Sequence, residues 1–215
     1  MSAFSTSVIP PKGFCPLTDK TVPLFERELK ENEAMAYTLA QVDVSAFKSF
    51  LLNSSKEIWD SNYHDKENVK LMRPAHDAWG IGKIMFTFCD DFLLKVLDLP
   101  FSQDPTWRKF LMPIYEACGV PENRIVRSLL ASMPPGVNIP VHHDTGFWVQ
   151  HTHRTHVAIC TDTGSVHFMV GHKDVSGEEG VHKYSFEEGR IVELNNQAKH
   201  AVRNEWDQNR IHLIF

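Results

Sequence analysis

The second half of the chain is a succession of short β-type segments separated by turn residues. The segments cover residues 125–133, 154–160, 166–170, 184–186, 190–194 and 210–215. Turn signals lie between them, among them Pro134-Pro135-Gly136 and Glu188-Gly189. Many short strands with turns between them are typical of an antiparallel sandwich or barrel. The sequence therefore predicts a mainly β domain after about residue 120.

The first half has a more helical character. Residues 44–59, with Asp43 as a candidate N-cap, and residues 104–118 carry apolar side chains at helical spacing. Residues 91–97 are also expected to form a short helix, and residues 81–89 a strand.

The helix expected at residues 104–118 has the clearest local signals. Asp104 is a candidate cap, Pro105 takes the first helical position, and Gly119 follows as a stop signal. Pro113 is expected to kink this helix.

These patterns divide one globular unit into two parts. We expect residues 1–120 to form an N-terminal lead-in, extended over residues 1–40, and a helical flank packed on the core. Residues 121–215 are expected to form the β core.

Composition excludes several classes of protein. Apolar residues make up 42% of the 215 residues, which supports a buried core. The formal net charge of −5 argues against a nucleic-acid or anionic-membrane partner. No segment reaches 18 consecutive apolar residues, and Met1–Phe14 does not resemble a signal peptide.

The four cysteines include no close pair, so we expect free thiols in a reducing, cytoplasmic compartment. The sequence gives no signal for an oligomeric state.

Histidines crowd into the β-rich half. Ten of the twelve lie between His142 and His212. Because histidine is the commonest protein ligand for metals and a frequent acid–base group, this crowding indicates a chemical site in the β core.

The His142-His143-Asp144 segment is the first candidate for such a site. His142 and Asp144 are two positions apart, so on an extended strand they point to the same side and His143 points away. His200 follows 58 residues after His142. Two neighbouring ligands and one distant ligand fit the two-histidine-one-carboxylate triad of non-haem Fe(II), which leaves three coordination positions open. The same three side chains can hold zinc with water, so zinc remains the alternative.

Arg210 lies ten residues after His200, on the strand that ends the chain. Its planar fork is suited to the far carboxylate of a dicarboxylate co-substrate. The alternative is a surface arginine paired with an acid, which contributes about 1 kcal/mol or less.

Four motifs together resemble the aspartyl/asparaginyl β-hydroxylase family of iron- and 2-oxoglutarate-dependent dioxygenases. In chain order they are Met133-Pro-Pro-Gly-Val-Asn-Ile-Pro-Val-His-His-Asp144, Arg154-Thr-His156-Val, the segment 186–204 around His200, and Asn209-Arg-Ile-His-Leu-Ile. They cover about 90 residues, from Arg127 to Phe215.

The resemblance implies a double-stranded β-helix, a jelly-roll of the cupin-like kind. It implies His142, Asp144 and His200 as iron ligands and catalytic residues. It also implies Arg210 as the clamp for the distal carboxylate of 2-oxoglutarate, with Arg154 and His156 near the co-substrate. The implied reaction consumes O2, decarboxylates 2-oxoglutarate to succinate and hydroxylates an unactivated C–H bond.

Two positions depart from the family pattern. The animal enzymes after which the family is named have glycine where this chain has Asp144, so we expect a complete triad here. The position of their co-substrate serine corresponds to Ala131, with Ser128 and Ser132 nearby, which leaves that role open.

The sequence gives weaker signals for the residues that bind the substrate. Trp148, Gln150, His151 and His153 either surround the substrate mouth or form an exposed polar turn. Arg127 either reaches a substrate carboxylate or sits in an ion pair, and His212 is expected to share the face of Arg210.

We expect a small amino-acid-like substrate, since the sequence shows neither a membrane anchor nor a peptide-binding repeat. The alternatives are Asp or Asn side chains of a protein, and a cupin-like metal-binding module without redox turnover.

Overall fold

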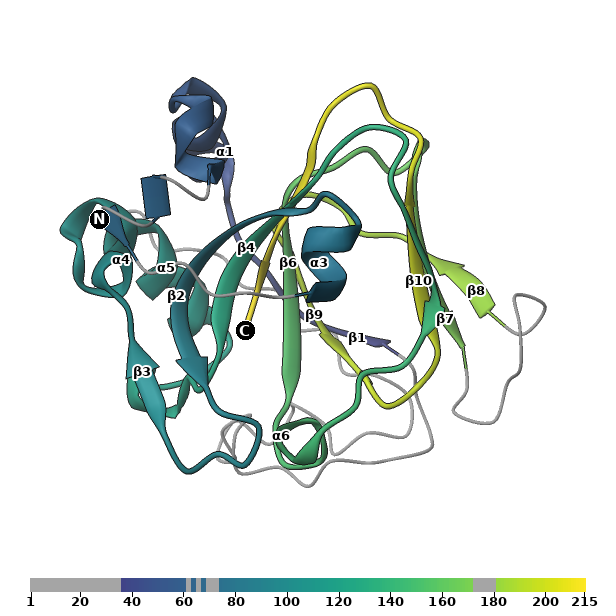
Figure 1. The fold of residues 1–215 in the computed structure, drawn as a ribbon. Helices are drawn as coiled ribbons and strands as arrows, with labels where there is room; N and C mark the ends of the chain where they lie inside the picture. Colours follow the sequence, from purple (N-terminus) through teal and green to yellow (C-terminus); the bar gives the residue numbers. More distant parts are fainter. Residues whose placement is uncertain (1–35, 61–62, 65–66, 69–73, 172–180) are drawn as a thin grey trace.

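Two antiparallel β-sheets form the framework of the protein in the computed structural model (Figure 1), which describes residues 36–60, 63–64, 67–68, 74–171 and 181–215. The larger sheet contains, in spatial order, β1 (Ala36–Gln41), β9 (Arg190–Leu194), β6 (Arg154–Cys160), β11 (Arg210–Ile214), β4 (Ser128–Met133), β2 (Gly82–Cys89) and β3 (Val96–Asp98). The smaller sheet contains β5 (Asn138–His142), β10 (His200–Asn204), β7 (Val166–Gly171) and β8 (Val181–Tyr184). The prediction of a mainly β, antiparallel protein is confirmed.

The helices are few and short. They are α1 (Ser45–Asn53), α3 (Pro74–Ala78), α4 (Pro100–Gln103), α5 (Pro105–Ala117) and α6 (Phe147–Gln150), with the 3-10 helices η2 (Lys56–Trp59) and η3 (Glu122–Arg124). Within the described ranges, none of them is long and apolar enough to cross a membrane.

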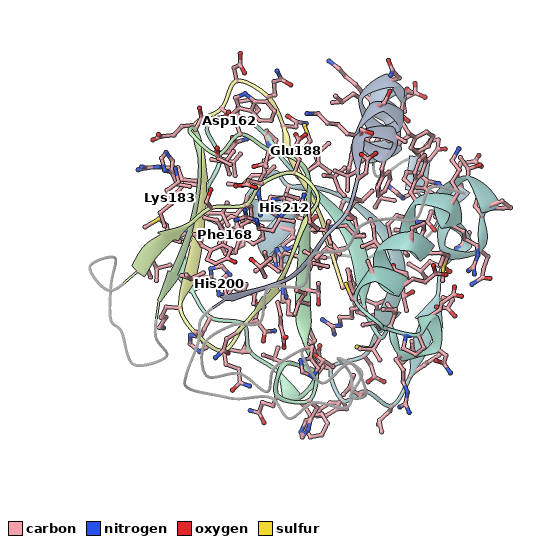
Figure 2. The ribbon with its side chains drawn as sticks, turned by 180° about the vertical axis from the view of Figure 1, so that it is seen from behind. Asp162, Phe168, Lys183, Glu188, His200 and His212 are labelled. Atoms are coloured by element: carbon pink, nitrogen blue, oxygen red, sulfur yellow. The ribbon has the colours of Figure 1, made fainter. Side chains whose placement is uncertain are left out.

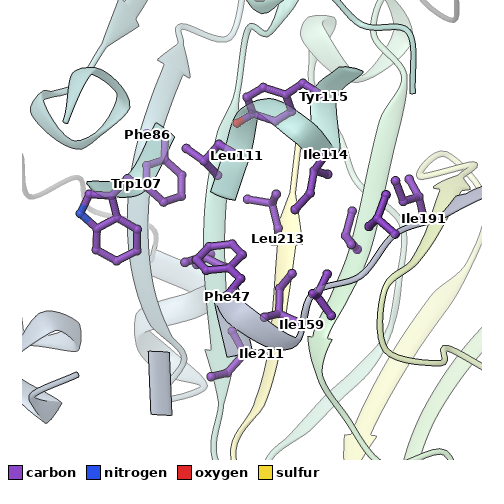
Figure 3. Close-up of a cluster of buried hydrophobic side chains, with 14 of the residues drawn as sticks. Phe47, Phe86, Trp107, Leu111, Ile114, Tyr115, Ile159, Ile191, Ile211 and Leu213 are labelled. Carbon is purple, nitrogen blue, oxygen red and sulfur yellow. The ribbon is translucent and has the colours of Figure 1, made fainter. Parts of the chain in front are cut away.

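Helices α1 and α5 cover the outer face of the larger sheet (Figure 3). Period-2 alternation along the strands creates this arrangement. On β11, Ile211 and Leu213 belong to the core cluster that contains Leu111 and Ile114 of α5. Arg210 and His212 alternate with them and therefore point toward the smaller sheet. The inner face of the larger sheet is thus free to carry polar groups.

Strands from the first 120 residues extend the larger sheet. β2 pairs with β4, β3 pairs with β2, and β1 pairs with β9. The change of character near residue 120 is therefore not a break between separate sheets. The lead-in expected at residues 1–40 lies mostly outside the described residues, and its last residues belong to β1.

The short helix predicted at residues 91–97 is wrong, because this segment forms a turn and then β3. The Asp90 carboxylate accepts the backbone N–H groups of Phe92 and Leu94, at 3.0 and 2.9 Å. These side-chain bonds compete with a helix and close a hairpin between β2 and β3.

The helix predicted at residues 44–59 is interrupted. It consists of α1 and η2, and Ser54 between them is extended, with ψ of 152°. The Ser55 side chain caps η2 by accepting the N–H of Glu57 at 3.2 Å. Asp43, the candidate cap, accepts the N–H of Ser45 at 2.8 Å.

The helix predicted at residues 104–118 is confirmed as α5. Asp104 accepts the N–H of Thr106 at 2.7 Å, Pro105 opens the helix and Pro113 lies within it. The strand expected at residues 184–186 is shifted to β8, which ends at Tyr184.

Candidate metal centre

The smaller sheet brings His142, Asp144 and His200 together. His142 ends β5, His200 begins β10, and the two are cross-strand partners whose ring centroids lie 4.2 Å apart. Asp144 follows β5, and its backbone N–H donates to Asn196 O at 2.9 Å. One possible ligand atom from each residue lies within 4.8 Å of the other two. This is the cluster that the His-x-Asp and distal-histidine motifs predicted.

Backbone carbonyls orient both imidazoles. Nδ1 of His142 lies 2.8 Å from Pro140 O, and Nδ1 of His200 lies 3.0 Å from Ala198 O. Because a carbonyl can only accept, Nδ1 is the donor in each ring, which leaves Nε2 as the atom that can bind a metal. This outer hydrogen bond is typical of metal-binding histidines, so the donor set fits a divalent metal.

The charges around the cluster suit metal ligands. Arg154 Nη1 donates to Asp144 Oδ2 at 2.7 Å. Burial raises the pKa of Asp144, but the charge of Arg154, with smaller contributions from His200, His142 and the Asn196 side chain, outweighs burial, and the pKa ends below its ordinary value. Burial lowers the pKa of His200 to about 4. Near neutral pH the carboxylate is therefore ionised and His200 is neutral, as coordination requires.

Arg210 lies deeper between the sheets, without an acidic partner. Its guanidinium is buried, and Nη2 donates to His212 Nδ1 at 2.8 Å. Nε has no hydrogen-bond partner, and no carboxylate pairs with the group among the residues that the structure describes. Burial alone lowers the pKa of Arg210 to about 9, so it stays charged at neutral pH. An unpaired buried cation is costly, which makes this position suitable for an anion.

Two further histidines surround the arginines. His156 accepts from Arg154 Nε at 3.2 Å through its Nε2, and its Nδ1 has no hydrogen-bond partner. Burial and the charge of Arg154 hold the pKa of His156 well below its usual range. Figure 2 shows His200, Phe168 and His212 in the space between the two sheets. Neutral imidazoles and guanidinium groups thus line the interior next to the metal ligands.

A cavity of about 210 Å³ connects these groups, and we call it the metal pocket. It contains all six residues predicted for the metal and the co-substrate: His142, Asp144, His200, Arg154, His156 and Arg210. His76 and Trp79 also line it, and the Trp79 ring centroid lies 5.7 Å from that of His142. No sequence motif marks these two residues, because only the packing of α3 brings them here.

The structure shows which residues near the motifs face the metal pocket. Ala131 lines the metal pocket, whereas Ser128 bonds Tyr115 at 2.6 Å and Ser132 accepts from Asn209 at 3.1 Å. No serine of β4 therefore faces the pocket. His143 is exposed and lies 3.1 Å from Lys199 Nζ, away from the cluster.

A second cavity of about 300 Å³ adjoins the first, and we call it the side pocket. Arg154 and Ile214 line both cavities. Of the four residues predicted for substrate binding, Trp148, His151 and Arg127 line the side pocket. The fourth, Gln150, is exposed and lines neither cavity.

Arg127 forms the ion pair that was its alternative interpretation. It bonds Asp91 Oδ1 at 3.0 Å and Cys89 O at 2.8 Å. It nevertheless also lines the side pocket, so the two interpretations are compatible. His212 does not line the metal pocket and supports Arg210 from behind.

A comparison with protein families agrees with the motifs. Residues 104–215, just over half of the chain, match the family model described as Aspartyl/Asparaginyl beta-hydroxylase. A comparison with curated proteins finds no significant match.

Solved structures give distant similarities. The non-haem monooxygenase ThoJ in complex with nickel has 18% identity over 41% of this chain and 41% of its own, with a TM-score of 0.35. An oxidoreductase of the 2OG-Fe(II) oxygenase family from Burkholderia pseudomallei has 13% identity over 86% and 91%, with a TM-score of 0.42. HygX from Streptomyces hygroscopicus, with nickel and 2-oxoglutarate bound, has 12% identity over 80% and 76%, with a TM-score of 0.44. The match spans less than half the length of ThoJ and most of the other two chains.

Proposed function

Because the chain belongs to the aspartyl/asparaginyl β-hydroxylase family, we propose that it is an Fe(II)- and 2-oxoglutarate-dependent dioxygenase. In this proposal it hydroxylates an unactivated C–H bond of a small amino-acid-like molecule. The co-substrate 2-oxoglutarate is decarboxylated to succinate in the same turnover.

The buried Arg210 is the observation that carries the proposal. A metal-binding module without redox turnover needs His142, Asp144 and His200 but has no use for an uncompensated cation in the same cavity. A dicarboxylate that reaches from the metal to Arg210 would neutralise this charge and use its free Nε–H. The 210 Å³ of the metal pocket suits a molecule of this size.

The residues of the pocket have separate tasks in this proposal. His142, Asp144 and His200 would hold ferrous iron, which supplies dioxygen activation when bound. Arg154 fixes the Asp144 carboxylate, and Arg210 orients the co-substrate by its distal carboxylate. Neutral His156 and His212 surround the arginines without adding charge, and Trp79 helps to exclude water from the His142 side.

We further infer that the two sheets form a double-stranded β-helix of the jelly-roll, cupin-like kind. The smaller sheet supplies the metal ligands and the inner face of the larger sheet supplies the arginines. Residues 121–215 contain all of them and would form the catalytic core, with residues 1–120 as its flank.

An anaerobic spectroscopic titration tests co-substrate binding. Addition of 2-oxoglutarate to the Fe(II)-loaded protein should produce a weak visible charge-transfer band. The band should require a concentration at least about 100-fold higher in Arg210→Leu, because two charge-assisted bonds are lost. Arg203→Leu removes an exposed arginine that pairs with Glu205 and serves as the control. Tight zinc binding with no band would favour the metal-binding module instead.

Succinate formation tests turnover and substrate together. Free amino acids and short peptides are screened with the protein, Fe(II), ascorbate and 2-oxoglutarate. A small molecule should stimulate succinate formation, and mass spectrometry should show one added oxygen on that molecule. Stimulation by peptides alone would favour the alternative of a protein Asp or Asn side chain. Unchanged succinate production after alanine replacement of all three ligands would contradict the oxygenase.

A further inference from the structure

The side pocket joins the metal pocket through a shared wall. Arg154 bonds the metal ligand Asp144 at 2.7 Å and lines both cavities, as does Ile214. At about 300 Å³, the side pocket is at the lower end of the range of small-molecule sites. A ligand there lies next to the metal centre without displacing a co-substrate bound to Arg210.

One wall of the side pocket is apolar. Trp148 and Val126 contribute to it, together with Leu93, Leu129 and Ile214. This surface favours an aliphatic or aromatic body on the ligand.

The charged groups of the side pocket all have the same sign. Arg124, Arg127 and Arg154 line it, and no aspartate or glutamate does so among the described residues. An ammonium group would therefore find no carboxylate in this lining, whereas a carboxylate would find guanidinium donors.

Arg127 and Arg154 each keep an unused donor. Arg127 bonds its neighbours through Nε and Nη2, which leaves Nη1 without a hydrogen bond among the described residues. Arg154 uses Nε and Nη1, which leaves Nη2.

Aromatic rings hold the Arg127 guanidinium in place, although its ion pair with Asp91 is weak. Its guanidinium lies 4.0 Å from the Trp148 ring centroid and 4.8 Å from that of Phe88. The side chain of Asp91, its ion-pair partner, is 74% exposed. Water screens this pair, so a second anion can still bind Arg127 strongly.

We propose that the side pocket binds the substrate of this hydroxylase by a carboxylate, with Arg127 as the principal donor and Arg154 as the second. The apolar body of the substrate lies against Trp148 and Val126. The substrate class is therefore a small carboxylic acid with an apolar body, and any amino group stays outside the pocket. This inference rests on the proposed function and adds the substrate class to it.

Two probes of the same shape test the carboxylate directly. 4-Methylpentanoate and 4-methylpentanamide have the same heavy-atom shape, but the amide is uncharged and carries an NH2 donor in place of one carboxylate oxygen. Their dissociation constants are measured on the metal-free protein by ligand-detected NMR. The acid should bind at least about tenfold more tightly than the amide, as expected for charge-assisted bonds in a partly buried site.

Variants show which arginine causes the preference for the acid over the amide. Arg127→Gln should remove the preference for the acid and leave amide binding unchanged, which also shows that the pocket is intact. Arg127→Lys should restore part of it. Arg108→Gln removes another arginine, one paired with the partly exposed Glu122, and should behave as wild type. Arg210→Leu should also keep the preference, which distinguishes the side pocket from the metal pocket.

Equal binding of the two probes to the wild-type protein would overturn the inference. So would a preference that survives Arg127→Gln or disappears in Arg210→Leu. Because these titrations contain neither iron nor 2-oxoglutarate, their failure would leave the charge-transfer band and succinate formation untouched. Conversely, loss of the band with an intact acid preference would overturn the proposed function alone.

Discussion

At the residue scale, Arg210 shows how a site can be recognised by what is missing around a side chain. A fully buried cation normally has a carboxylate partner, because the loss of hydration costs several kcal/mol. Arg210 instead has a neutral imidazole at 2.8 Å, the Phe168 ring centroid at 5.6 Å and an unpaired Nε. The metal-free, ligand-free protein therefore carries a destabilising group at the position where the proposed co-substrate binds.

Replacement of Arg210 by methionine should separate stability from binding. The variant loses a buried charge and keeps a similar volume, so we expect its free energy of unfolding to lie within about 1 kcal/mol of wild type, or above it. Its affinity for 2-oxoglutarate should fall at least about 100-fold. Urea unfolding and calorimetric titration measure the two quantities. A loss of more than about 3 kcal/mol of stability would mean that Arg210 is a structural residue.

His212 should make stability depend on pH. Burial and the charge of Arg210 hold its pKa well below 6.5 in the folded protein. Below pH 6.5 the unfolded chain therefore binds a proton that the folded protein excludes. Stability falls as the pH decreases, by about 1.4 kcal/mol per pH unit for each such group.

Urea unfolding of the metal-free protein between pH 7.5 and 5 measures this slope. His212→Gln keeps an acceptor for Arg210. It should lower the slope by the contribution of about one proton, which is about 1.4 kcal/mol per pH unit. His167→Gln replaces a partly exposed histidine that pairs with Glu205 and serves as the control. Identical slopes in all three proteins would show that His212 does not exclude a proton.

At the element scale, the elements predicted correctly are those whose signals are local. The cap, the proline and the stop glycine of α5 all lie within its own sequence, from Asp104 to Gly119. Residues 91–97 were assigned incorrectly because the deciding group, the Asp90 carboxylate, precedes the segment and closes a hairpin. β1 was missed because its strand structure depends on pairing with β9, about 150 residues later.

The β8–β9 turn provides an element-scale prediction with a matched control. Gly189 and Gly136 have nearly the same φ, +76° and +77°. A Cβ on Gly189 would lie 1.9 Å from Val42 O, whereas a Cβ on Gly136 meets nothing within 4 Å. Gly136→Ala should cost about 1 kcal/mol of stability from its backbone conformation alone. Gly189→Ala should cost at least about 2 kcal/mol more, because the chain that follows β1 must move. Equal losses of stability in thermal or urea unfolding would show that the segment at Val42 can move at little energetic cost.

At the scale of the whole molecule, the site exists only because the two sheets face each other. The ligands His142 and His200 belong to the smaller sheet, and Arg154 and Arg210 belong to the larger one. Sequence motifs predicted these residues because each motif lies on one strand or turn. His76 and Trp79 could not be predicted in this way, since α3 reaches the metal pocket only through packing. Trp148, His151 and Arg127 were predicted for substrate binding, but only the packing of α6 near the start of β4 brings them into one pocket.

Metal binding should therefore stabilise the whole molecule and not a single strand pair. At a free Ni²⁺ concentration of about 100 times Kd, binding to the folded state adds about 2.7 kcal/mol, which corresponds to a rise in Tm of about 5–10 °C for a protein of this size. His142→Ala should reduce the rise to less than about 2 °C, because one of three ligands is lost. His143→Ala is the matched control: this neighbour is exposed and points toward Lys199, so the rise should remain. Thermal unfolding with and without Ni²⁺ checks both variants, and a rise that depends on His143 instead of His142 would place the metal outside the pocket that contains Arg210.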